Sequence, residues 1–355
     1  QDQEPEASEL NRVRTIVAAP VGALLYAYAF YVPEGPPSKL YFWISWLGNI
    51  PVRVLLFVEI LFLVINLGSI ASYCRKYGTA CLDELCFGDQ VLRRKILAVF
   101  PNALTVMNAF MGLIAVFFAY QGRLRESYLM LMGAATFDKL DGALARRLGL
   151  TEPLPEETHE KKINMGSIMD DLADAISFCI VPAWIFYITL SQFGEGRFAH
   201  LPVGWIAGFY ALMGVGRLVY FTLDKTPIPG FFKGLPTPAA AMLVMSPLVI
   251  FDQALALSSQ RILFWGFFAT GTMVFAGVIM NVYPIHYLHM GRTMSRHPWF
   301  GRVNLLLLTV SIFTPIFGQI CLGYAILYLL SPLYTWRINP EEAARESRRK
   351  SMAEG

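Results

Sequence analysis

Four aspartates stand in two pairs within apolar stretches of this sequence. Asp138 and Asp141 lie in one stretch, and Asp170 and Asp174 lie in the next. A charge inside a membrane costs several kcal/mol unless it is paired, hydrated or bound to a metal ion, so such acids are candidates for function. Their spacing of three and four residues puts each pair on one face of a helix. Two pairs of carboxylates can therefore face each other.

Clustered carboxylates repel one another unless a cation neutralises them, and their hard oxygen ligands suit Mg²⁺ or Mn²⁺. Two such ions, about 3.5 to 4 Å apart, could hold the oxygens of a pyrophosphate. On the same faces, Gly142, Ala145 and Gly166 leave room for a bulky ligand, and Arg146 can neutralise a phosphate. Asp171 projects away from these faces, as a helix N-terminal charge or a contact to substrate.

Acids inside a membrane have other uses as well. They occur in structural ion-pair clusters and along the ion paths of secondary transporters. An ion-coupled transporter predicts an internal repeat with broken helices at equivalent positions. The sequence holds no second copy of the acid motif.

The elements that position these acids are membrane helices. Of the 355 residues, 55% are hydrophobic and 15% charged, and the mean hydropathy is +0.48, which is outside the soluble range. The net charge of +3 and the lack of a basic, aromatic-rich block exclude nucleic acid as a partner. The acidic start lacks the basic flank of a cleavable signal peptide, so we expect the first apolar run to be retained.

Apolar runs of about 18 to 25 residues mark the spans. We expect helices at 13–31, 53–73, 102–121, 126–147, 166–190, 203–221, 237–256 and 262–286, and two shorter ones within 303–334, where Pro315 and Gly318 predict a break. The connections at 75–100 and 151–162 are expected to be polar insertions. The predicted fold class is all-α, a polytopic transmembrane bundle of about ten helices with a six-helix catalytic core. Lys and Arg gather in alternate connections, which places both termini and the acids on the cytoplasmic side.

The acid motif resembles the signature of a known family. The strings DKLDGALAR (138–146) and GSIMDDLAD (166–174) fit DxxDGxxAR…GxxxDxxxD, the signature of the CDP-alcohol phosphotransferases, at all eight specified positions. Each specified residue has a background frequency on the order of one in twenty, so a chance match is improbable. The resemblance implies transfer of a phosphate-linked group from a CDP-activated lipid to an alcohol, with membrane lipids around the enzyme and a homodimeric assembly.

The resemblance also implies roles for individual residues. Asp138, Asp141 and Asp170 would be metal ligands, and Asp174 the general base beside them, counted here as a fourth candidate ligand. Two divalent ions, Mg²⁺ or Mn²⁺, would bind per site. Residues expected to line the nucleotide pocket are Asn102, Thr105, Asp138, Gly142, Ala145, Arg146 and Gly166.

Three further segments resemble the phosphatidylserine synthase subgroup: PNALTVMNAFMGLIA (101–115), SFCIVPAW (177–184) and FFKGLPTPAAA (231–241). They imply CDP-diacylglycerol as the donor and serine as the acceptor, while choline, inositol phosphate and glycerol phosphate stay open. A serine carboxylate needs a cation, and Arg217 or Lys233 could supply it; Asp171 is a further candidate contact. We divide the chain into an extension with two helices and a cytoplasmic loop (1–100), the catalytic core (101–290), two C-terminal helices (291–336) and a charged cytoplasmic tail (337–355).

Overall fold

The computed structural model describes residues 9–29, 52–87, 89–150, 165–193, 196–224, 228, 230–291 and 298–335. The chain divides into two compact units, Gln1–Lys95 and Ile96–Gly355. The insertion expected at 151–162 and the tail at 337–355 lie outside the described residues.

The first unit contains two helices that pack against each other, α1 (Glu9–Ala29) and α3 (Val52–Cys86). The polar connection expected at 75–100 is largely helical instead: α3 continues to Cys86, and only three residues separate it from α4 (Gln90–Tyr120). Asp89 explains the early start of α4, because its Oδ1 accepts the backbone N–H groups of Val91 at 2.8 Å and Leu92 at 3.1 Å. This is a helix N-cap, and it satisfies donors that would otherwise stay unpaired.

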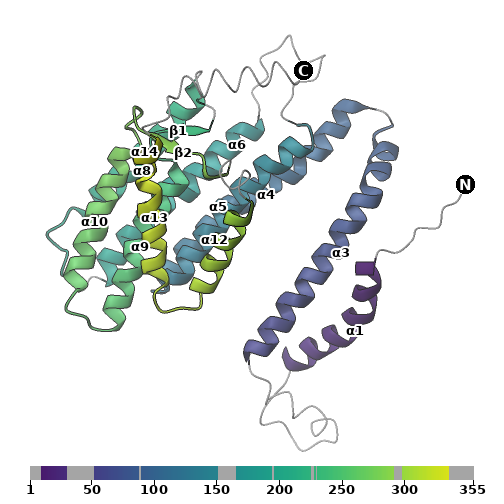
Figure 1. Ribbon diagram of the computed structural model, residues 1–355, viewed down its shortest axis with the longest axis horizontal. Coiled ribbons are helices and arrows are strands. Elements are labelled where there is room, and N and C mark those ends of the chain that lie inside the picture. Colours follow the sequence, from purple (N-terminus) through teal and green to yellow (C-terminus); the bar gives the residue numbers. More distant parts are fainter. Residues whose placement is uncertain are drawn as a thin grey trace, which may run out of the picture. The chain divides into compact units, whose positions relative to one another are not determined.

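The second unit is a helix bundle (Figure 1). After α4 come α5 (Leu124–Arg147) and one long span made of α6 (Met165–Asp174), the π-helix η3 (Ala175–Ile180), α7 (Val181–Ile188) and the π-helix η4 (Thr189–Phe193). The rest of the bundle is α8 (Val203–Leu223), α9 (Thr237–Ala256), α10 (Ile262–Ile279), α12 (Pro298–Ser311), α13 (Phe317–Leu329) and α14 (Ser331–Thr335). Between α12 and α13 lies the predicted break, which is confirmed.

Six helical segments among the described residues are long and apolar enough to cross a membrane: Gln90–Tyr120, Gly166–Phe193, Val203–Leu223, Thr237–Ala256, Ile262–Ile279 and Phe317–Tyr334. Their outer faces expose large apolar side chains, such as Trp205 at 84% and Leu212 at 71%. Exposure on this scale suits lipid rather than water. The predicted all-α polytopic fold is confirmed.

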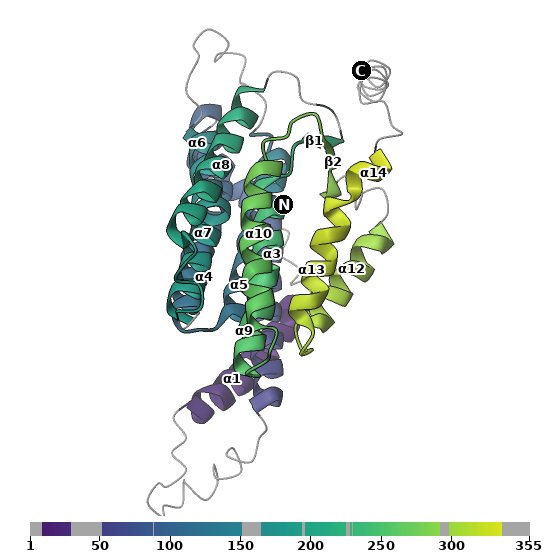
Figure 2. The ribbon, with the colours of Figure 1, turned by 90° about the vertical axis from the view of Figure 1, so that its left-hand side faces the viewer.

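The centre of the bundle is α9, which contacts α5, α7, α8, α10 and α13 (Figure 2). Its buried residues are apolar apart from Thr237 and Ser246. The Ser246 hydroxyl lies 2.7 Å from the Met242 carbonyl of its own helix and 3.3 Å from the Tyr128 hydroxyl of α5, so its polarity is satisfied inside the bundle.

A proline shapes the span that carries Asp170 and Asp174. Pro182 has no N–H, so the carbonyl of Phe178 loses its ordinary helical donor. The buried hydroxyl of Tyr210, on α8, donates to that carbonyl instead, at 3.1 Å. Phe178 belongs to the π-helix η3, which begins directly after Asp174. π-helical turns inside α-helices often mark functional sites.

A two-stranded antiparallel sheet interrupts the all-helical pattern. Strand β1 (Phe231–Lys233) pairs with β2 (His286–Leu288), with Phe231 opposite Leu288 and Lys233 opposite His286. The helix predicted over 262–286 therefore ends early, at Ile279, because the following residues turn and enter β2. Both views place this sheet at the same end of the bundle as α6 (Figures 1 and 2).

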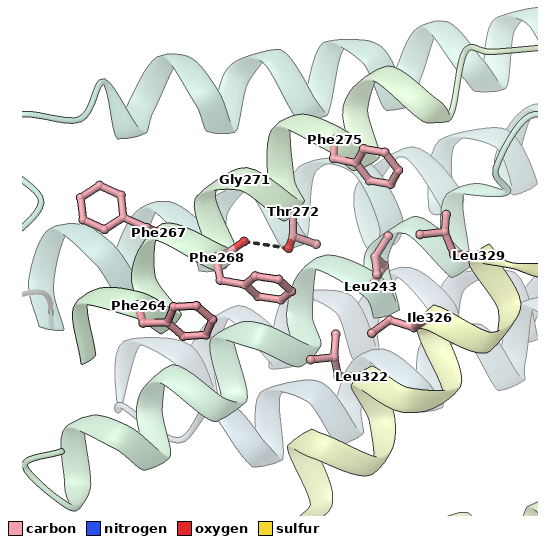
Figure 3. A pocket seen from close by; sticks show the side chains of 10 residues that line it. All are labelled: Leu243, Phe264, Phe267, Phe268, Gly271, Thr272, Phe275, Leu322, Ile326 and Leu329. Carbon is pink, nitrogen blue, oxygen red and sulfur yellow. Dashed lines mark hydrogen bonds between the residues drawn. The ribbon is translucent and has the colours of Figure 1, made fainter. Parts of the chain in front are cut away.

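An apolar pocket of about 630 Å³ lies between α9, α10 and α13 (Figure 3). Four of its lining residues are the phenylalanines Phe264, Phe267, Phe268 and Phe275 of α10. Thr272 is the polar member, and its hydroxyl is already bonded to the Phe268 carbonyl at 2.7 Å. The pocket has no ionisable group in its lining, so the candidate chemistry lies elsewhere.

Candidate functional site

The bundle brings the aspartates together. Asp138 and Asp141, near the end of α5, and Asp170, on α6, each offer an oxygen within 4.8 Å of the other two. The fourth acid, Asp174, ends α6, and its carboxyl group lies within hydrogen-bonding distance of that of Asp138. The two helices therefore present the facing pairs that the spacing predicts.

This cluster fits a divalent cation. At 4.8 Å, two unit charges repel by about 3.5 kcal/mol at an effective dielectric constant of about 20. Three ionised carboxylates at that separation destabilise the site unless a positive charge lies among them. Asp170 Oδ1 is buried and has no hydrogen-bond donor among the described residues. An all-carboxylate ligand set with an unsatisfied oxygen suits Mg²⁺ or Mn²⁺.

Two neutral side chains of α4 hold the acids from one side. The Thr105 hydroxyl donates to Asp141 Oδ2 at 2.7 Å. One turn further along, Asn108 Nδ2 donates to Asp174 Oδ1 at 3.0 Å. Each donor serves a different helix of the acid cluster, so α4 fixes α5 and α6 relative to each other. Thr105, expected to face the nucleotide, uses its proton on a metal-ligand candidate.

Asn108 was not predicted from the sequence. It is fully buried, and its backbone carbonyl accepts the Ser177 hydroxyl at 3.0 Å. A Cβ at Gly112 would lie 2.8 Å from Ser177 Oγ, so glycine permits this close approach of α4 to η3. The signal that could have revealed Asn108 is its spacing, because Asn102, Thr105 and Asn108 recur every three residues in an otherwise apolar helix.

The residues expected to line the nucleotide pocket flank the acids. Gly142, Ala145 and Arg146 lie in the last turns of α5, and Arg146 is exposed. A Cβ at Gly142 would meet only Arg146 Nη1, at 3.5 Å. The face beside Asp141 is therefore open enough for a ligand to approach the backbone. Asn102 on α4 and Gly166 on α6 are both partly exposed.

Asp171 points away from the acid cluster, as its helical position predicts. Its Oδ2 accepts the Thr222 hydroxyl of α8 at 3.1 Å. This bond connects the second half of α6 with the end of α8.

The two cations predicted near the acceptor differ in their surroundings. Lys233 on β1 forms an ion pair with Asp224, with Nζ to Oδ2 at 2.7 Å. Arg217 on α8 is only 3% exposed, and its Nε has no hydrogen-bond partner among the described residues. Its guanidinium carbon lies 5.4 Å from the Phe221 ring centroid. Arg217 forms no ion pair among the described residues, although Asp224 lies within electrostatic range of its guanidinium, whereas Lys233 is paired directly with Asp224.

His286 adds no positive charge beside these cations. Burial, together with the nearby Lys233, lowers the pKa of its imidazole below the ordinary value. The ring is therefore neutral at pH 7.

Two contacts fix the level of Arg217 along the bundle. A Cβ at Gly214 would lie 2.7 Å from Cys179 Sγ, and Thr222 bonds to Asp171. These pairs show that α8 runs antiparallel to the α6–η3 span in direct contact with it. Arg217 thus stands opposite residue 176, about 3 Å along the axis from Asp174 at 1.5 Å per residue.

Comparison with known proteins gives a consistent picture. A model of the family "CDP-alcohol phosphatidyltransferase" matches residues 98–278. The chain is 29% identical over 224 residues to the CDP-diacylglycerol–serine O-phosphatidyltransferase of Mycobacterium leprae, covering 60% of this chain and 66% of that protein. It is 32% identical over 146 residues to the archaetidylserine synthase of Methanothermobacter thermautotrophicus, covering 41% and 56%.

A relative with a different printed acceptor matches as well. The phosphatidylcholine synthase of Brucella melitensis is 27% identical over 225 residues, covering 63% of this chain and 68% of that protein. The chain spans slightly less than two thirds of the Mycobacterium leprae relative, at 66% of its length.

Proposed function

Because this chain belongs to the CDP-alcohol phosphatidyltransferase family, we propose that it transfers the phosphatidyl group of CDP-diacylglycerol to the hydroxyl of a small polar alcohol and releases CMP. The observation that carries the proposal is the cluster of Asp138, Asp141 and Asp170 within 4.8 Å, with Asp174 beside it. Acids so arranged can hold a pyrophosphate through divalent cations and have a base next to it.

The roles follow from chemistry and position. Asp138, Asp141 and Asp170 hold two divalent ions, Mg²⁺ or Mn²⁺, with Asp174 as a possible fourth ligand. When bound, these ions offset the charge of the pyrophosphate and of the departing CMP. Asp174 accepts the proton of the acceptor hydroxyl, which is a poor nucleophile while protonated. Asn108 holds one oxygen of Asp174, which leaves the other for this proton.

The CDP moiety lies along the open face of α5. Gly142 admits it close to the backbone, and Arg146 neutralises phosphate charge. Asn102, Ala145 and Gly166 complete the walls, as the family resemblance implies. Thr105 acts on the same site indirectly, through its bond to Asp141.

The acceptor carries a negative charge, and L-serine is the acceptor we propose. Arg217 supports this, because its guanidinium is buried, forms no ion pair among the described residues and shares its nearby Asp224 with Lys233, so an anionic ligand would stabilise it. Arg217 stands at the level of residue 176 on the α6–η3 span, two residues past Asp174, so the anion would bind at the same depth in the membrane as the base. Choline brings a positive charge and would be repelled, whereas inositol phosphate and glycerol phosphate are compatible. Lys233, paired with Asp224, is the weaker candidate. Asp171 is occupied by Thr222.

We also propose on which side of the membrane the site lies and in which oligomeric state the protein works. Most of the 29 Lys and Arg residues fall in connections that would share one side of the membrane with both termini and the acids. We assign that side to the cytoplasm, where a water-soluble acceptor can reach a lipid pyrophosphate. A homodimer is proposed from the family resemblance.

The test is release of CMP by purified protein. The protein is supplied with CDP-diacylglycerol and Mn²⁺ or Mg²⁺, and with serine, inositol phosphate, glycerol phosphate or choline in separate reactions. We expect CMP with serine, none after chelation of metal, and none from Asp174→Asn. The matched control is Asp252→Asn, a partly buried acid of α9 near Glu126 at the start of α5, far from Asp138.

Absence of CMP with all four acceptors would sink the proposal. Ion-driven uptake of a solute into proteoliposomes without any CDP-lipid would instead favour a secondary transporter. Activity in Asp174→Asn equal to wild type would remove that residue from its role as base.

A further inference from the structure

The space around Arg217 is bounded in part by a helix that the family model does not reach. That model ends at residue 278, whereas α13 begins at Phe317. Tyr328, near the end of α13, has a phenolic oxygen within electrostatic range of the guanidinium of Arg217.

Tyr328 is fixed to the sheet by two contacts. Its hydroxyl donates to the backbone carbonyl of Leu288, on β2, at 3.1 Å. Its ring stacks on that of Tyr287, with centroids 5.9 Å apart and an angle of 26° between the planes. Tyr287 is only 1% exposed. The sheet and α13 are therefore joined at one buried point.

The sheet in turn covers Arg217. Leu288 pairs with Phe231 of β1, and β1 leads into Gly234, whose N–H donates to the Ile285 carbonyl at 2.8 Å. Gly234 has φ +72°, and a Cβ there would lie 3.7 Å from Arg217 Nε and would collide with the Met280 carbonyl oxygen. The Met280 carbonyl and the positive φ therefore require glycine here, and the Gly234 backbone lies in contact range of the guanidinium.

A second pair of aromatic rings bounds another side of the space around Arg217. Tyr220 of α8 and Tyr283 stack with centroids 3.5 Å apart and planes 13° apart, and both phenolic oxygens lie within electrostatic range of Arg217. Tyr283 donates its hydroxyl proton to Asn281 Oδ1 at 2.8 Å. Asn281 in turn donates to the Met213 carbonyl of α8 at 3.0 Å. This wall is held by its own bonds and does not depend on α13.

We propose that α13 completes the site for an acceptor that bears a carboxylate or a phosphate. Tyr328 is a positioning residue in this site. It fixes β2, and because β2 pairs with β1, it also fixes the backbone at Gly234 that covers Arg217. The inference rests on the proposed function, because it names the part of the chain that shapes the acceptor end of that same site. It assigns acceptor recognition in part to a segment outside the family-matched region. The donor end of the site, on α5 and α6, makes no use of Tyr328.

The test compares Tyr328→Phe with Tyr324→Phe. Tyr324 lies one turn earlier on α13, and its hydroxyl bonds to Asn304 of α12 at 3.0 Å, so it controls for loss of a phenol on the same helix. CMP release is measured while serine and CDP-diacylglycerol are varied separately. We expect Tyr328→Phe to raise the KM for serine about three- to tenfold, the range for one hydrogen bond. Its KM for CDP-diacylglycerol and its kcat should stay within about twofold, and Tyr324→Phe should change neither KM.

A second measurement does not need turnover. Serine and inorganic phosphate are titrated against the melting temperature of each protein. Stabilisation seen in wild type should weaken in Tyr328→Phe and vanish in Arg217→Gln. An unchanged serine KM in Tyr328→Phe, or equal losses in both KM values and kcat, would overturn the inference. If wild type binds serine but releases no CMP with any acceptor, the proposed function fails while the anion site stands; if it neither binds nor reacts, both fail.

Discussion

Replacing Asn108 by leucine should slow the reaction without unfolding the protein. Asn108 Nδ2 donates to Asp174 Oδ1 at 3.0 Å in a fully buried position. A hydrogen bond to a charged group contributes about 1.5 to 3 kcal/mol. Since about 1.4 kcal/mol is a factor of ten in rate, kcat should fall about 10- to 150-fold.

The stability of Asn108→Leu should change little. Asn108 Oδ1 has no hydrogen-bond partner among the described residues, so leucine removes an unsatisfied buried oxygen together with the amide donor. Leucine is close to asparagine in shape, so the contact of α4 with η3 should be retained. The melting temperature is therefore expected to stay within a few degrees of wild type.

The assay is CMP release at saturating CDP-diacylglycerol and acceptor, with two controls. Met107→Leu changes the neighbouring, partly exposed position of α4 and should leave kcat unchanged. Ser177→Ala removes the bond to the Asn108 carbonyl but leaves the amide on Asp174, so its loss should stay below about tenfold. If folded Asn108→Leu keeps more than a third of wild-type kcat, Asn108 does not hold Asp174 in its reactive position.

Three further changes test the structure around the acids. Thr105→Val removes the 2.7 Å bond to Asp141 and should raise the Mn²⁺ concentration for half-maximal activity about tenfold or more, whereas Thr105→Ser should restore it. Asp170→Asn should abolish Mn²⁺ binding in calorimetry, because it replaces a carboxylate of the three-acid cluster; full-strength binding would refute that ligand set. Gly214→Ala places a Cβ 2.7 Å from Cys179 Sγ and should cost about 1 to 3 kcal/mol of stability, which a second change, Cys179→Ala, should largely recover in thermal unfolding.

The aspartate pairs could be predicted because their information is local. A spacing of three or four residues fixes a shared helical face before any tertiary contact forms. The hydropathy of the spans is equally local, which is why the helices from α5 to α9 lie close to their predicted ranges. The early end of α10 at Ile279 shows the opposite case, because the pairing of β2 with β1 depends on a segment some fifty residues earlier. The start of α4 at Gln90 does not follow from hydropathy, because its first turns contain Arg93, Arg94 and Lys95 and depend on the cap that Asp89 provides.

The side chains that donate hydrogen bonds to these aspartates could not be predicted in the same way. Thr105 and Asn108 act on helices that follow 36 and 66 residues later, and nothing in their own neighbourhood says which acid each will meet. Arg217 was a candidate from its charge alone. Only the assembled bundle shows how Arg217 and Lys233 differ. Arg217 is buried, whereas Lys233 forms an ion pair with Asp224.

There is a physical reason why the side chains that bond to the acids are neutral, whereas the buried Arg217 on α8 is charged. If Thr105 or Asn108 were lysine or arginine, each would compensate an acid and weaken the field that draws a divalent cation to the cluster. Neutral donors orient the carboxylates and leave their charge available. In the function that we propose, Arg217 supplies positive charge from a separate helix, α8, where an anionic acceptor would meet it without neutralising the candidate metal ligands. A site that must hold cations and an anion side by side is therefore expected to place its neutral donors on the acids and its buried arginine on the acceptor.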